Sequence, residues 1–181
     1  MFWKNFFKNS NLLAFTTSYS ELEQDQKKFL MVRKGIEYKG EEVQLVFSTD
    51  KSINIMEYHK LCESVGWECP SLQKVYLAIK NSFITLSLFY QKQGKMQLIG
   101  FARVTSDQVF NAVIWDVVIH PTFQGQGLGK ILIYQTLSQL RSYNIMNIGL
   151  FADSNVVSFY SKLGFIKDPN GMKGMFWFPV D

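Results

Sequence analysis

The chain has 181 residues, of which 47% are hydrophobic and 19% are charged. This length predicts a single domain, and the composition excludes a disordered chain, because such chains lack the apolar surface that offsets chain entropy. The net charge of +4 comes from basic residues scattered along the sequence. Without a basic stripe interleaved with aromatic residues we expect no nucleic-acid partner, whereas the charge is compatible with a phosphorylated small molecule.

No run of residues approaches the roughly 20 apolar positions that a membrane-spanning helix requires, and no signal peptide is recognisable. We therefore expect no membrane partner. The two cysteines, Cys62 and Cys69, form no CxxC pair and have no paired histidines near them in the sequence. Neither a disulfide nor a metal site is predicted, and both residues are interpreted as reduced thiols in a reducing compartment.

Residues 1–40 show no sustained apolar period. We expect them to form a poorly ordered extension, with a short helix near residues 21–32. The domain itself is expected to span residues 41–181.

Four strands and two helices are expected in the first half of this domain. Val43, Leu45 and Phe47 alternate with polar residues, which predicts the first strand. Apolar residues at three- and four-residue intervals predict two helices, over residues 55–65 and 72–79. β-branched and aromatic residues on either side of Gln93-Gly94 predict a hairpin, followed by a further strand, over residues 83–90, 96–104 and 109–119.

A glycine-rich loop comes next, and an amphipathic helix is predicted to begin at Leu128. Asp153-Ser154-Asn155 offers N-cap chemistry for a second helix, and Gly164 suits the left-handed residue that ends it. The remaining segments are predicted as strand, helix and last strand, over residues 145–151, 156–163 and 175–180. Together these elements predict an α/β fold with a mixed, mostly antiparallel central sheet of about six or seven strands flanked by about four helices.

The loop Gln124-Gly125-Gln126-Gly127-Leu128-Gly129 lies between an apolar strand and this amphipathic helix. Missing Cβ atoms let several N–H groups approach one anion, and the helix N-terminus adds partial positive charge. The loop therefore predicts a diphosphate cradle, with Lys130 as a possible extra charge. Gln124 and Ile131 exclude a P-loop, and Lys130 excludes a dinucleotide fingerprint. A ligand-free strand-to-helix turn is the alternative.

This loop matches the Q/R-x-x-G-x-G/A signature of the GNAT superfamily of acetyltransferases, and its strand and helix context resembles that family's central motif. Asn155 and the run 159–165 resemble the family's next motif. Three further segments resemble the plastid and cyanobacterial branch that includes plant serotonin N-acetyltransferase: 114–121, 150–154 and 173–177. The resemblance covers roughly residues 42 to 180 and implies the acyl-CoA N-acyltransferase fold.

The resemblance implies acetyl-CoA as cosubstrate and no metal. Its diphosphate would lie on the loop, from Gln124 through Gly125, Gln126, Gly127 and Leu128 to Gly129, beside Lys130. Its pantetheine arm would pair with the backbone of Val118 and Ile119, and a backbone N–H near Val118 would stabilise the oxyanion. Asn155 and Tyr160 would line the arm and the thioester. For Asn155, a role as helix cap alone is an equal alternative.

Asp116 is the candidate general base. An amine with a pKa near 10 is mostly protonated at neutral pH, so its proton must leave before the nitrogen attacks. Asp116 interrupts the apolar run 113–119, where an unpaired carboxylate is costly unless it has a task or a partner. Such burial would make it a better proton acceptor, directly or through a water. The alternative is an ion pair with a neighbouring strand, such as with Arg103.

Tyr160 is the candidate general acid, because the leaving CoA thiolate needs a proton that a phenol can supply. This role is the one that the resemblance implies for the residue. The alternative is a core aromatic on an amphipathic helix. His59 and His120 receive no role.

These features predict an N-acetyltransferase that moves an acetyl group from acetyl-CoA to a primary amine by direct attack in a ternary complex. The amine would be an arylalkylamine, such as serotonin or tryptamine, or a protein lysine or N-terminus. Trp67 could wall an indole pocket, although core packing is the favoured interpretation for it. The alternative function is a catalytically silent acyl-CoA-binding regulator with a protein partner. The resemblance implies location in the plastid stroma, or in the cytoplasm if the protein is cyanobacterial. We expect a monomer or a homodimer.

Overall fold

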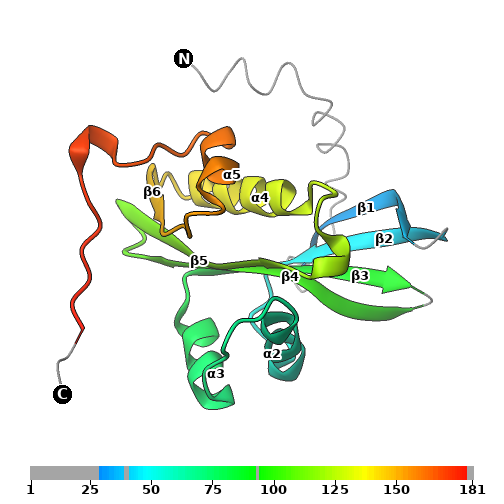
Figure 1. Cartoon of the computed structure of the whole chain (residues 1–181). Helices are drawn as coiled ribbons and strands as arrows, with labels where there is room; N and C mark the ends of the chain where they lie inside the picture. The colour runs from blue at the N-terminus through cyan, green and yellow to red at the C-terminus, as the bar shows by residue number, and fades with distance from the viewer. Residues whose placement is uncertain (1–28, 39–40, 93, 179–181) are drawn as a thin grey trace.

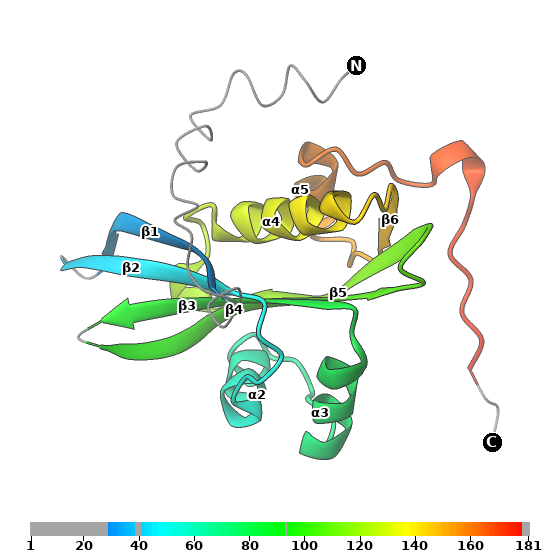
Figure 2. The same ribbon diagram turned by 180° about the vertical axis from the view of Figure 1, so that it is seen from behind.

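The computed structural model describes residues 29–38, 41–92 and 94–178. It shows one sheet with helices on both faces: α4 and α5 cover one face, and α2 and α3 cover the other (Figure 1, and from behind in Figure 2). The strands are β1 (Phe29–Tyr38), β2 (Glu41–Ser48), β3 (Ile84–Lys92), β4 (Lys95–Ser106), β5 (Asn111–Ile119) and β6 (Asn147–Leu150). The helices are α2 (Ile55–Ser64), α3 (Leu72–Asn81), α4 (Leu128–Ser142) and α5 (Val157–Lys162), with 3-10 turns η3 (Pro121–Phe123) and η4 (Pro169–Gly171).

The strands lie side by side in chain order, from β1 to β6. Every neighbouring pair is antiparallel except β5 and β6, which run parallel because α4 crosses over between them. The predicted mixed, mostly antiparallel sheet is therefore confirmed, with six strands and four α-helices among the described residues.

The two early helices pack under the middle of the sheet. α2 begins at Asn54, whose side chain accepts the N–H of Met56 at 2.9 Å and so caps the helix. The apolar side chains of α2 and α3 then bury against β4 and β5, in a cluster of Tyr58, Leu61, Cys62, Val75, Ile79, Leu98, Phe101 and Val118. Both helices were predicted from the spacing of these residues.

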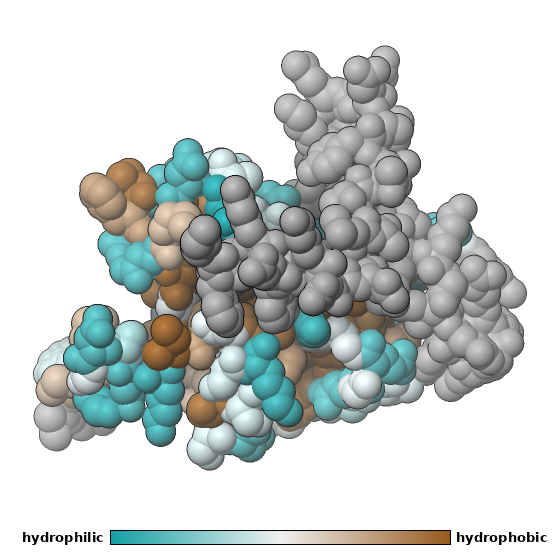
Figure 3. All heavy atoms as spheres, turned by 90° about the horizontal axis from the view of Figure 1, so that it is seen from above, coloured by the Kyte–Doolittle hydropathy of each residue, from teal (hydrophilic) through white to brown (hydrophobic). Residues whose placement is uncertain are grey.

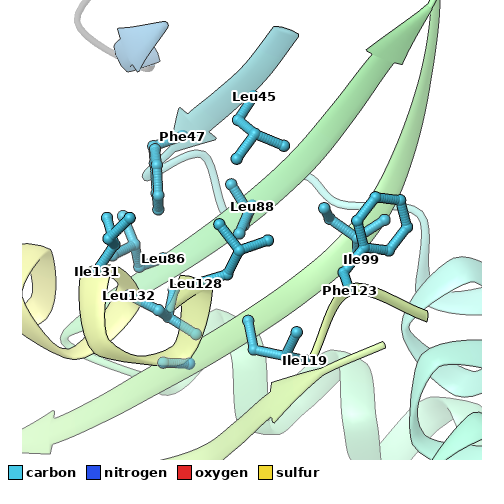
Figure 4. Close-up of a cluster of buried hydrophobic side chains, with 11 residues drawn as sticks. Leu45, Phe47, Leu86, Leu88, Ile99, Ile119, Phe123, Leu128, Ile131 and Leu132 are labelled. Carbon is cyan, nitrogen blue, oxygen red and sulfur yellow. The ribbon is translucent and has the colours of Figure 1, made fainter. Parts of the chain in front are cut away.

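The other face of the sheet carries the main core. The start of α4 packs against the central strands, and alternate residues of each strand point toward it (Figure 4). Its buried members include Leu45, Phe47, Leu86, Leu88, Ile99, Ile119, Phe123, Leu128, Ile131 and Leu132. This packing fixes the start of α4 against the end of β5, which is where the glycine loop lies.

Three predictions about the chain ends are wrong or incomplete. The sheet begins at Phe29 and not at residue 41, because β1 pairs with β2 along its length, from Phe29 opposite Ser48 to Tyr38 opposite Glu41. The predicted helix near residues 21–32 is wrong where it overlaps β1, and the rest of it, with residues 1–28, lies outside the described residues. The predicted last strand is absent from its described part, since residues 172–178 form neither helix nor strand.

Candidate active site

The glycine loop connects β5 to α4 through two glycines in the left-handed region. After β5, the Nδ1 atom of His120 accepts the N–H of Thr122 at 3.3 Å and starts η3. Gly125 and Gly127 then have φ of 77° and 78°, which side-chain-bearing residues rarely adopt. Gly127 is the N-cap of α4. The predicted strand, loop and helix arrangement is therefore confirmed.

The end of this loop leaves backbone donors without an acceptor inside α4. The first intrahelical bond of α4 runs from the N–H of Ile131 to the carbonyl of Gly127, at 3.1 Å. The N–H groups of the three residues before Ile131 therefore have no acceptor within the helix. No heavy atom lies within 4 Å of the Cβ positions of Gly125 and Gly127. Donors, helix dipole and free space together fit a diphosphate.

The two glutamine side chains of the loop donate hydrogen bonds to backbone carbonyls just before it. Gln124 donates its amide to the carbonyl of Ile119 at 2.8 Å, and Gln126 donates to the carbonyl of Thr122 at 3.4 Å. The ammonium of Lys130 lies 5.6 Å from the centre of the Tyr134 ring. In this arrangement the two glutamines shape the cradle, and the backbone supplies the donors that face open space.

β5 is irregular next to the loop. Phe101 lies opposite Val118, but Arg103 lies opposite Trp115, so β5 holds one more residue than β4 over this stretch. This β-bulge contains Asp116, whose φ is 53°. The pairing with β6 ends at Ile114, so residues 115–119 have no strand on their outer side among the described residues. The sheet is therefore open between β5 and β6, on the loop side.

The open edge offers the backbone of Ile119 and not that of Val118. The N–H of His120 donates to the carbonyl of Ile99 on β4 at 2.7 Å. Because backbone direction alternates along a strand, the N–H of Val118 also faces β4, and that of Ile119 faces the open edge. The N–H of Val118 itself is therefore directed into the sheet, and its side chain packs against α2, so Val118 does not offer its backbone to the arm. An oxyanion donor near Val118 stays a prediction, and the neighbouring N–H that faces the open edge is that of Ile119.

Asp116 has two partners. Its Oδ2 atom accepts hydrogen bonds from Nε of Arg103, across the strand pair, and from the hydroxyl of Tyr58 on α2, at 3.1 Å for the latter. The carboxylate is half-buried, with 27% of its side chain exposed. The structure thus shows the ion pair that was the alternative interpretation of this acid. With both partners bound, Asp116 still lies at the wall of a cavity.

The groups around Asp116 stay protonated at neutral pH. Burial raises the pKa of the Tyr58 phenol far above its usual range, and the charge of Asp116 adds to this effect. Burial also raises the pKa of the Cys62 thiol to about 12. At neutral pH the Tyr58 phenol therefore keeps the proton that it donates to Asp116, and Cys62 is a neutral thiol nearby. Cys62 is buried and Cys69 is partly buried, and both are free.

Asp116 lines a cavity of about 590 Å³ between α2, α3 and the sheet. Its walls include Tyr58, Trp67, Glu68 and Arg103. Trp67 is 40% exposed, so it is a wall of this cavity and not the core residue that packing would predict. The cavity combines aromatic surface with charges of both signs, which suits an amine-bearing substrate.

Tyr160 does not line the cavity that Asp116 lines. It is buried on α5, and burial raises the pKa of its phenol, with the charge of Asp153 adding to the effect. It lines a second cavity of about 730 Å³, beside β6 and the segment that follows α5. The structure therefore does not bring Asp116 and Tyr160 into one cavity. Asp116 itself lies on β5, just past Ile114, where the pairing of β5 with β6 ends.

Asn155 is not a helix cap. α5 begins at the N-cap Val156, without any side-chain cap hydrogen bond, so the cap prediction for residues 153–155 is wrong. The side chain of Asn155 is exposed. Gly164, by contrast, follows α5 with φ of 93°, as predicted.

Tyr58 is the residue of the candidate site that the sequence prediction missed. A buried carboxylate in an apolar strand needs hydrogen-bond donors from other segments of the chain. A tyrosine on the apolar face of the first predicted helix is one such candidate donor. Which residue lies near the acid depends on how α2 crosses the sheet, and residue spacing does not carry that information.

The described residues contain no helix long and apolar enough to cross a membrane. Among them, no group of three or more metal-ligating side chains gathers. The fold and the loop define a class of α/β protein with a glycine-rich loop at a helix N-terminus, suited to an anion, beside an opened sheet edge.

Residues 53–165 match the model of the acetyltransferase (GNAT) family. The chain belongs to this family and is an N-acetyltransferase; members of the family use acetyl-CoA. The fold is also that of a Staphylococcus aureus protein described as a probable acetyltransferase, with a TM-score of 0.63 at 20% identity over 75% of this chain and 99% of that one.

Three relatives are similar over most of their length. An uncharacterised N-acetyltransferase, ycf52, from Pyropia yezoensis is 52% identical over 99% of both chains. A histone acetyltransferase, TAP1, from Glycine max is 44% identical over 91% of this chain and 74% of its own. A chloroplastic GCN5-related N-acetyltransferase from Arabidopsis thaliana is 37% identical over 98% of this chain and 80% of its own.

Proposed function

We propose that this enzyme transfers an acetyl group from acetyl-CoA to a primary amine by direct attack in a ternary complex. The observation that carries the proposal is the opened edge of β5, with the anion cradle at one end and the Asp116 cavity beside it. A diphosphate on the N-terminus of α4 places the attached arm along this edge, where the backbone of Ile119 faces it. The thioester then points toward the cavity that receives the amine.

Two side chains of the enzyme would handle protons. Asp116 takes a proton from the bound ammonium, directly or through a water, and the neutral nitrogen attacks the thioester carbon. When the tetrahedral intermediate collapses, the C–S bond breaks and the thiolate takes a proton from Tyr160. The raised pKa of Tyr160 keeps this phenol protonated until then. The second proton that the nitrogen loses on becoming an amide passes through water to the Tyr160 phenolate, which restores the phenol.

The amine is either a protein amine or an arylalkylamine. The 44% identity with a protein called a histone acetyltransferase supports a lysine side chain or N-terminus. The exposed face of Trp67 in the cavity wall supports an aromatic amine, through stacking of about 0.5–1.5 kcal/mol. We propose membership of the branch that includes serotonin N-acetyltransferase on the same ground. We also propose location in the plastid stroma, which the chloroplastic relative supports.

A panel of acceptors tests this function. We expect CoA release from acetyl-CoA with at least one of three amines: a lysine peptide, a peptide with a free N-terminus, or tryptamine. Trp67→Ala should raise KM for tryptamine about tenfold and change KM for the peptides little, if stacking selects the aryl group. Acetyl-CoA binding without release of CoA for any amine would favour the alternative, a catalytically silent regulator that acts through a protein partner.

A further inference from the structure

The two cysteines of the chain lie on the face of the sheet that α2 and α3 cover, opposite the face seen from above in Figure 3. Cys62 is in the last turn of α2, and Cys69 is in the segment that joins α2 to α3. Both line the cavity that contains Asp116, and Cys69 packs against the buried cluster to which Cys62 belongs. Cys62 is 2% exposed, whereas Cys69 is only partly buried, so a dissolved reagent reaches Cys69 first.

A left-handed turn after α2 carries the chain back to the helix that it has just left. Gly66 has a φ of 79°, a conformation that glycine adopts without strain. The N–H of Trp67 then donates to the carbonyl of Cys62 at 3.1 Å, which is the hydrogen bond that closes such a helix end. In a continuous helix, residues 62 and 69 would lie about 10 Å apart along the axis. The turn instead returns Cys69 to the cluster that contains Cys62.

The Cys62 thiol is in hydrogen-bond contact with the thiol of Cys69 and with the hydroxyl of Tyr58. Tyr58 in turn donates to Asp116, so the two thiols adjoin the candidate base. Burial raises the pKa of Cys62 to about 12, so at neutral pH this thiol is protonated and unsuited to attack a thioester. Two adjacent thiols at a cavity wall can instead be oxidised together to a disulfide.

We propose that Cys62 and Cys69 are a reversible thiol–disulfide pair, and that their disulfide alters the cavity that receives the amine. The oxidant is a small disulfide, such as oxidised glutathione. The Cys69 thiolate attacks one sulfur of this disulfide, and the other half leaves as a thiolate. Cys62 then loses its proton to water, attacks the Cys69 sulfur of the mixed disulfide and releases the second half. In total the two protein thiols lose two protons and two electrons, and the small disulfide becomes two thiols.

The disulfide would change one wall of the cavity. Its two sulfurs lie about 2.05 Å apart, closer than two hydrogen-bonded thiols, so the segment with Trp67 and Glu68 is drawn toward α2. Oxidation also removes the Cys62 S–H beside Tyr58. We expect a higher KM for the amine and an unchanged affinity for acetyl-CoA, because the anion cradle lies at the start of α4. The effect on KM rests on the proposed function, whereas formation of the disulfide does not.

Mass spectrometry of the full chain in glutathione buffers tests the disulfide. The chain has two cysteines, and trypsin releases both in one peptide, residues 61–74. We expect this peptide to become about 2 Da lighter on oxidation, by the two hydrogens lost, and dithiothreitol to reverse the change. Because the fold holds the thiols together, half-oxidation should need about tenfold less oxidised glutathione in the folded chain than in urea. Equal midpoints, or glutathione that stays attached to Cys69, overturn the proposal.

Two further measurements on the same samples test the effect on the cavity. Oxidised wild type should have a KM for the accepted amine raised about threefold or more, with one acetyl-CoA affinity in both states. Cys69→Ser is the control, and its KM should be the same in oxidising and reducing buffer. Hydrogen–deuterium exchange of residues 65–71 should slow on oxidation, whether or not any amine is acetylated. Unchanged exchange in the oxidised chain overturns the proposal, and so does an unchanged KM, whereas a reduced chain that acetylates no amine refutes the proposed function alone.

Discussion

The hydroxyl of Tyr58 donates a hydrogen bond of 3.1 Å to Oδ2 of Asp116, 58 positions later in the chain. Arg103 donates to the same oxygen. Among the described residues, no hydrogen bond reaches Oδ1 of Asp116. The two donors therefore hold the carboxylate in one orientation, and Oδ1 is the oxygen that can accept a proton from an amine or a water.

Asp116→Asn should lower kcat by about 10²–10⁴-fold at neutral pH, the usual contribution of a general base. Acetyl-CoA affinity should change little, because the anion cradle does not involve this residue. The loss should shrink as pH rises toward the pKa of the amine, since deprotonated amine then arrives without help. Steady-state kinetics between pH 6.5 and 9.5, with calorimetric titration of acetyl-CoA, measures all three.

Arg103→Gln is the control for this experiment, because it removes the ion pair and keeps the carboxylate. If Asp116 acts as base, Arg103→Gln should keep a larger share of wild-type turnover than Asp116→Asn. Equal losses in the two variants, with no dependence on pH, would assign Asp116 a structural role only.

Tyr160→Phe should keep the fold and acetyl-CoA affinity and lower kcat by about 10²-fold or more, because only the proton donor is removed. The ring contacts with Phe159 and Phe165 stay. Tyr143→Phe, at a tyrosine that is 55% exposed after α4, is the matched control and should retain full activity. Full activity of Tyr160→Phe would refute the acid role.

Gly127→Ala should be destabilising by about 1–2 kcal/mol, because its φ of 78° is strained for a residue with Cβ. The added methyl also enters the open space of the cradle, so acetyl-CoA should bind more weakly. Gly129→Ala is the control: its Cβ would lie 3.5 Å from Phe159, an ordinary contact, and alanine favours a helix. Thermal unfolding should show a lower Tm for the first variant only, and equal Tm values would contradict the strain argument.

Stability should fall as pH rises above about 9. Burial raises the folded-state pKa of Tyr58, Cys62 and Tyr160, so the unfolded chain loses these protons before the folded chain does. Their contribution is therefore complete below the unfolded pKa values, near 9 for the thiol and 10 for the phenols, and is lost above them. Tm measured from pH 8 to 11 should decline, less steeply in Tyr58→Phe. A wild-type Tm that does not change over this range would be inconsistent with buried, neutral groups.

Much of the fold follows from local sequence patterns. The helix containing Tyr58 and the hairpin around Gly94 are marked by the spacing of apolar residues, and Gly125 and Gly127 mark a turn that other residues do not tolerate. Asp116 was identifiable as a candidate site residue because burying an unpaired carboxylate in an apolar strand costs free energy. Each of these signals is contained within one segment.

What the sequence left open depends on segments that meet in space. β1 carries Arg33, Lys34 and Glu37 among its apolar residues, so its strand character comes from pairing with β2. Residues 175–178 have strand-forming side chains but no described partner strand, so propensity alone did not decide their structure. The backbone of Ile119, and not that of Val118, faces the open edge. This choice follows from the alternating hydrogen bonds between β5 and β4, and therefore from the register of the two strands.

Calorimetric titration of the purified chain with CoA and with pantetheine, which lacks the diphosphate, is the most direct test of the cradle at the start of α4. We expect CoA and acetyl-CoA to bind in the micromolar range, Gly127→Ala to weaken both, and pantetheine to give no measurable heat at the same concentrations. Equal binding of pantetheine and CoA, or no heat with CoA and acetyl-CoA, would contradict a diphosphate cradle at the start of α4.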